Sequence, residues 1–79
     1  MTDNQATMPI EVRISEPLLV DELVTAFLRN GCVAQRGSDD SCLVVHVHAA
    51  HAKEARLELA FFVRAWQLQH PAVSAVVTP

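Results

Sequence analysis

The chain is poor in the residues that usually build a recognisable catalytic or binding motif. It has two glycines, two cysteines, one tryptophan and no tyrosine in 79 residues. Two separated glycines exclude a glycine-rich phosphate loop, and the spacing of Cys32 and Cys42 excludes a Cys-x-x-Cys metal or redox motif. No nucleophile motif and no carboxylate pair with an assignable role is present. The sequence therefore identifies no enzyme, and it predicts no cofactor.

Clustered positive charge is also missing from the sequence. The formal net charge is −3, and the six basic residues are spread among acidic ones. A nucleic-acid-binding protein normally carries a basic stripe, so no nucleic-acid partner is expected. No apolar run approaches the roughly 20 residues that span a bilayer, and residues 1–9 lack the apolar segment of a signal peptide. We therefore expect no membrane partner and a cytoplasmic location, where both cysteines stay reduced.

Apolar residues are plentiful and predict a packed core. They make up 51% of the chain, which argues against disorder. A chain this short forms one domain of marginal stability unless a disulfide, a metal or a partner is added. Residues 1–8 are polar and aperiodic, so we expect a disordered tail there. Residues 9–79 are then the single domain.

The spacing of the apolar residues predicts four strands and two helices. Ser15-Glu16-Pro17 has the composition of a helix start, and Asn30-Gly31 that of a helix stop. A turn cluster at 37–41 separates two strands, and Pro71 follows the end of the second helix. The strands are expected at residues 9–15, 32–36, 42–48 and 72–77, and the helices at 17–29 and 51–69. Trp66 should be buried in the core with Leu23 and Phe27 nearby.

The resulting order, β-α-β-β-α-β, consists of two split βαβ units. Right-handed crossovers then give an α+β two-layer sandwich, with a four-stranded antiparallel sheet of order 4-1-3-2 and both helices on one face. This pattern resembles ferredoxin-like, ACT-like regulatory modules over residues 9–78, and short bacterial proteins of no assigned function. The loop at residues 15–17 has no glycine, so the resemblance implies a fold and not an amino-acid-binding site.

His46-x-His48 is the sharpest local feature of the sequence. If Leu43 faces the helices, both histidines face the open side of the sheet, beside Glu11 and Arg13 of the first strand. Such a group could contact a small ligand or a partner, or hold a metal through Glu11 and the two imidazoles. The alternative function is thus a small enzyme or metal-binding domain that uses His46 and His48. We expect instead an ordinary solvated face with no metal.

Two further features predict self-association. Leu57 and Phe61 lie off the buried stripe of the second helix, where they would be exposed. The last strand, with Val73 and Val76, has no charged residue to protect a sheet edge. An RNA-binding sheet is disfavoured because the first and third strands carry no aromatic residue. The sequence therefore predicts a small cytoplasmic binding or protein-interaction module that acts through the open sheet face, as a homo-oligomer such as a homodimer or with a protein partner.

Overall fold

The structure, a computed structural model, describes residues 9–47 and 49–78. The predicted disordered tail at residues 1–8 lies outside the described residues. The elements follow one another in the order β1 (Ile10–Ile14), η2 (Pro17–Leu19, a 3-10 helix), α1 (Val20–Arg29), β2 (Val33–Arg36), β3 (Ser41–Val45), α2 (Ala52–Leu68) and β4 (Ala75–Val77). No helix in this part of the chain is both long enough and apolar enough to cross a membrane.

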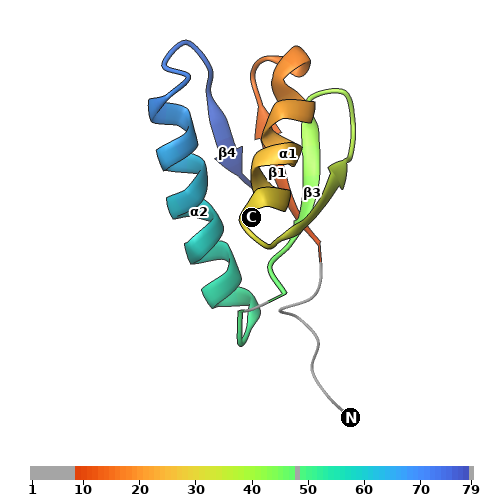
Figure 1. The fold of residues 1–79 in the computed structure, drawn as a ribbon, viewed down its shortest axis with the longest axis vertical. Coiled ribbons are helices and arrows are strands. Elements are labelled where there is room, and N and C mark those ends of the chain that lie inside the picture. The colour runs from red at the N-terminus through yellow and green to blue at the C-terminus, as the bar shows by residue number, and fades with distance from the viewer. Residues whose placement is uncertain (1–8, 48, 79) are drawn as a thin grey trace.

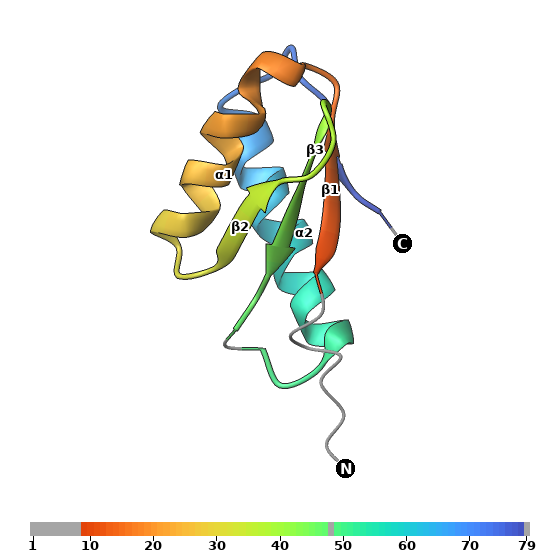
Figure 2. The same ribbon diagram turned by 90° about the vertical axis from the view of Figure 1, so that its right-hand side faces the viewer.

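The four strands form one antiparallel sheet in the order β2-β3-β1-β4, which is the predicted order read backwards (Figure 1). Both helices pack on the same face of this sheet, and none of the described residues forms a helix on the other face (Figure 2). The predicted α+β architecture is confirmed. The sheet ends at β2 on one side and at β4 on the other, so the last strand is an edge strand.

The first α-helix begins at Val20 and not at the predicted residue 17, because residues 17–19 form the separate 3-10 turn η2. Glu16 caps this turn, since its carboxylate accepts a hydrogen bond from the Leu18 backbone N–H at 3.4 Å. The Ser15 hydroxyl instead accepts one from the Ser74 backbone N–H at 2.8 Å, and so ties this loop to the segment before β4. The helix ends as predicted: Gly31 follows it with a φ of 85°, a conformation that glycine adopts without a steric cost.

The core lies between the helices and the sheet. Phe27 and Phe62 meet with ring centroids 4.6 Å apart, and Trp66 is buried in the same cluster as Leu23 and Phe27, as predicted. Trp66 also stacks on the ring of His70, with centroids 4.0 Å apart. β4 is shorter than expected because Pro71 and Ala72 form a turn, and the Val73 N–H bonds the His70 carbonyl at 2.9 Å.

The predicted orientation of β3 is wrong. Val12 of β1 pairs with Cys42, and Ile10 pairs with Val44, and all four side chains are buried beneath the helices. Residues alternate between the two faces of a strand, so Leu43 and Val45 lie on the open face. The sequence did not decide this because β3 is apolar at successive positions.

Candidate functional site

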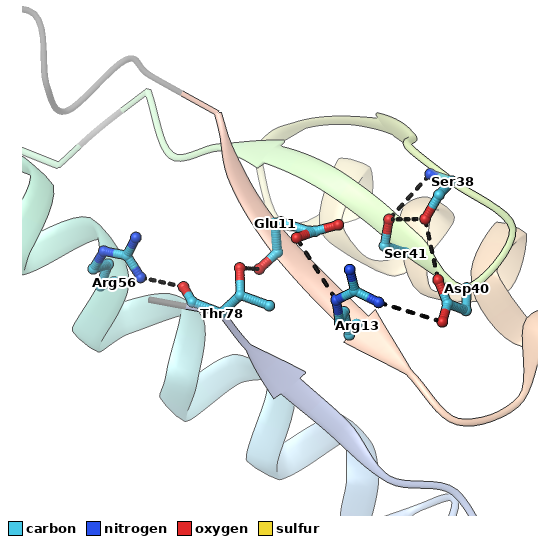
Figure 3. Close-up of polar contacts among 7 residues, drawn as sticks. All are labelled: Glu11, Arg13, Ser38, Asp40, Ser41, Arg56 and Thr78. Carbon is cyan, nitrogen blue, oxygen red and sulfur yellow. Dashed lines mark hydrogen bonds and ion pairs between the residues drawn. The ribbon is translucent and has the colours of Figure 1, made fainter.

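Glu11 and Arg13 lie on the open face of the sheet, as predicted, and form part of an ion-pair chain (Figure 3). Arg13 Nε lies 3.8 Å from Glu11 Oε1, and Arg13 Nη1 lies 3.5 Å from Asp40 Oδ2. Asp40 in turn accepts a hydrogen bond from the Ser38 hydroxyl at 3.1 Å. An anionic ligand would compete with two carboxylates for this guanidinium, so the group is poorly suited to bind one.

His46 does not join Glu11 and Arg13, which corrects the predicted grouping. It follows β3 on the helix side of the sheet, where its Nε2 lies 2.6 Å from Glu58 Oε1 of α2. The imidazole lines a recess of about 210 Å³. The other residues of this recess are Asn30, Cys32, Glu58, Leu59 and Phe62. His48 lies outside the described residues. The proposed metal ligands Glu11 and His46 are thus separated by the sheet.

The recess at His46 lacks an activated nucleophile. Burial, and secondarily the charge of Glu58, raises the pKa of the Cys32 thiol, so the neutral form dominates at physiological pH. Cys42 is also free, and burial raises its pKa to about 11. In the described part of the chain, no group of three or more histidine, cysteine or acidic side chains is arranged to hold a metal. The His46–Glu58 pair links β3 to α2.

The open face of the sheet is aliphatic over β2 and β3. Val45 pairs with Val33, and Leu43 lies between Gln35 of β2 and Glu11 of β1. The side chain of Val33 is exposed, and those of Leu43 and Val45 are half-buried by their neighbours. Sequence reasoning missed this patch, because it placed Leu43 beneath the helices, and Val45, two residues on, faces the same side as Leu43.

A groove runs between α2 and β4. Three adjoining hollows of about 430, 300 and 330 Å³ follow the length of the helix. The first and second share Arg64 and Gln67, and the second and third share Ala60 and Val77, so the three form one groove. The other residues that line it are Lys53, Arg56, Leu57, Val63, Leu68, Pro71, Ala75 and Val76.

Only two of the four predicted interface residues line this groove. Leu57 and Phe61 of α2 are 58% and 67% exposed, and Val76 of β4 is 55% exposed. Leu57 and Val76 line the groove, but Val73 is only 9% exposed and packs in the core. The helix side of the groove was detectable from the sequence, since its residues recur at spacings of three and four. No protein-family model, curated protein or solved structure matches this chain.

Proposed function

We propose that the protein is a small protein-interaction module that self-associates through the open face of its sheet. One observation carries the proposal: β3 is apolar on both faces, with Cys42 and Val44 beneath the helices and Leu43 and Val45 on the opposite side. Strands of this composition are typical of sheets that are covered on both faces. The two helices cover one face only (Figure 2). The proposed second layer is another copy of the chain.

The charges of the open face support a second copy as its partner. Arg13 lies between Glu11 and Asp40, so its charge is balanced within the same surface. A two-fold interface brings identical patches together, and an unbalanced charge near its axis would repel its own copy. Here the aliphatic patch of Val33, Leu43 and Val45 is uncharged, and it lies beside an ion-pair chain of one guanidinium and two carboxylates. Two copies of the patch itself can therefore meet without a like-charge conflict.

The proposal extends to the fold group and the cellular location of the domain. We assign the domain to the ferredoxin-like, ACT-like group, because the element order and strand order are those of that group. The two free thiols are consistent with a reducing, cytoplasmic location. The proposed role is that of a homodimeric binding module.

Self-association is testable by light scattering or sedimentation equilibrium. We expect a mass of about twice the 8.7 kDa of one chain at micromolar concentration. Val33→Lys and Val45→Lys each place a charge in the patch and should give a folded monomer. Leu18→Lys is the matched control, because Leu18 is exposed in η2, far from the patch in the sequence and on another element. A wild-type monomer, or a dimer that survives both patch variants, would refute the proposal.

A further inference from the structure

The groove between α2 and β4 borders an open strand edge. The Thr78 N–H bonds the Glu11 carbonyl at 2.9 Å, and the Ser15 N–H bonds the Ser74 carbonyl at 2.8 Å. Hydrogen bonds alternate along an antiparallel pair, so residues 74, 76 and 78 direct their backbone groups to β1. Ala75 and Val77 therefore direct theirs to the outer edge. A strand edge of this kind is a template for another strand.

One of these outward groups is already held by α2. The Gln67 side-chain oxygen accepts a hydrogen bond from the Ala75 N–H at 3.4 Å. The bond is long, so a strand carbonyl placed at the edge can replace it with a shorter one. The Val77 N–H and the Ala75 and Val77 carbonyls complete the outward set. At Ala75, an incoming strand would therefore compete with Gln67 of α2 for the backbone N–H.

The groove is cationic although the chain is acidic. Lys53, Arg56 and Arg64 line it, which is half of the six basic residues in the chain. Among the described residues, no carboxylate lies within ion-pair distance of these three cations. Arg56 donates to the Thr78 carbonyl, a neutral acceptor (Figure 3). The groove therefore presents positive charge that the described part of the chain does not balance.

The carboxylates of α2 lie away from the groove. Glu58 contacts His46 in the recess beside Asn30, and Glu54 accepts a hydrogen bond from the Ala50 N–H at 2.7 Å. The helix thus separates its charges, with cations toward β4 and carboxylates on another flank. A two-fold pairing of two copies through this groove would bring the same three cations together. Such like-charge contacts are unfavourable, so a second copy is a poor occupant.

We propose that this groove binds an extended peptide segment of another protein, which carries acidic and apolar residues and adds to β4 as a fifth strand. Lys53 and Arg56 lie toward one end and Arg64 toward the other, with Ala60, Val63 and Val77 between them. Lys53 and Arg64 are eleven positions apart, which is about 16 Å along the helix axis. Four steps along a strand span about 13 Å, so positions i and i+4 can hold the carboxylates and position i+2 an apolar side chain.

The proposal is tested with a fluorescein-labelled heptapeptide, TETVTET, and its lysine counterpart, TKTVTKT. Fluorescence anisotropy with the full chain should show that TETVTET binds at least tenfold more tightly, and that added salt weakens its binding. Lys53→Glu with Arg64→Glu should reduce its affinity at least tenfold. A matched pair of single variants gives the control: Arg64→Glu should clearly reduce the affinity, whereas Arg29→Glu, the same charge change at the exposed end of α1, should change it less than twofold. Equal binding of the two peptides would overturn the proposal.

Two edge variants distinguish strand addition from simple charge attraction. Val77→Pro removes an outward N–H while it leaves the hydrogen bonds to β1 in place, a position where sheets tolerate proline. It should weaken TETVTET binding about fivefold or more. Gln67→Ala releases the Ala75 N–H and should tighten binding, and it remains informative if Val77→Pro does not fold. Binding that neither variant alters, or equally tight binding of a single-stranded oligonucleotide, would contradict a peptide strand.

Discussion

The open face of the sheet and the groove beside α2 are both exposed and partly apolar, but they differ in whether their positive charges are paired with carboxylates. On the sheet, Arg13 is neutralised by Glu11 and Asp40. In the groove, Lys53 and Arg64 have no carboxylate partner among the described residues. An uncharged patch beside paired charges can meet a copy of itself, whereas a surface with unpaired charges of one sign selects a partner of opposite charge.

The two surfaces also differ in shape. The sheet face is built from side chains of four neighbouring strands, and it meets the groove at Val76, which pairs with Arg13 and lines the middle hollow. The groove has a helix for one wall and an unpaired strand edge for the other. A broad face suits another broad face, and a groove at a strand edge suits an extended segment.

The comparison depends first on the orientation of β3. Val44→Asp should unfold the domain, because an unpaired charge beneath the helices costs several kcal/mol, a large part of the stability of a small domain. Val45→Asp should change the free energy of unfolding much less and act mainly on self-association. Urea denaturation of the two variants measures the difference. Equal destabilisation would show that Val45 is a core residue and would remove the aliphatic patch from the open face.

The assignment of the groove as a docking surface depends on which side of α2 packs in the core. Leu59 is 2% exposed and Leu57 is 58% exposed, so the two leucines form a matched pair on one helix. Leu59→Ala should destabilise the protein by about 2–5 kcal/mol, and Leu57→Ala by less than about 0.5 kcal/mol. Thermal or chemical denaturation compares them directly. A cost above about 2 kcal/mol for Leu57→Ala would assign that side chain to the core and not to a docking groove.

A smaller effect, a pH dependence of stability, should come from His70, which belongs to the fold and to neither surface. The two ring nitrogens of His70 face the Trp66 carbonyl and Glu22 Oε2, each at 3.0 Å, and only the protonated ring donates to both. The Trp66 carbonyl first, and Glu22 second, raises the pKa of His70.

The sign of the pH dependence follows from that raised pKa. The stabilisation is fully present below the unfolded-state pKa of about 6.5 and is lost as the pH rises through the higher folded-state pKa. Denaturation midpoints should therefore fall over this interval in the wild type, and Glu22→Gln should reduce the change. A pH dependence that Glu22→Gln leaves intact would show that another group causes it. Neither surface contains His70 or Glu22, so peptide affinity should not follow this titration.

The sequence predicted those features that rest on local rules. Gly31 ended the first helix as expected, and the stripe through Leu59 and Trp66 placed the second helix on the sheet. The orientation of β3 was mispredicted because Cys42, Leu43, Val44 and Val45 are all apolar. No alternation of polar and apolar residues shows which face of the strand is buried. Only pairing with β1, which alternates strictly, determines which of them is buried.

The site was less predictable than the fold because it depends on neighbours far apart in the sequence. His46 and Glu58 are 12 residues apart and meet only when β3 lies beneath α2. Lys53, Arg56 and Arg64 look dispersed along the chain, and they line one flank only once the helix is formed beside β4. A helical projection of residues 52–68 would have shown the separation of charge, but not the open edge next to it.

The central claim, that one surface pairs with a copy and another takes an acidic strand, is tested most directly by NMR. In a titration of the full chain with TETVTET, the amide signals of Ala75, Val76 and Val77 and of the cationic flank of α2 should shift. The amides of Val33, Leu43 and Val45 should remain unchanged, and the molecular mass measured in parallel should rise only by the bound peptide. Shifts centred on Val33, Leu43 and Val45, or dissociation of the dimer by the peptide, would contradict the account.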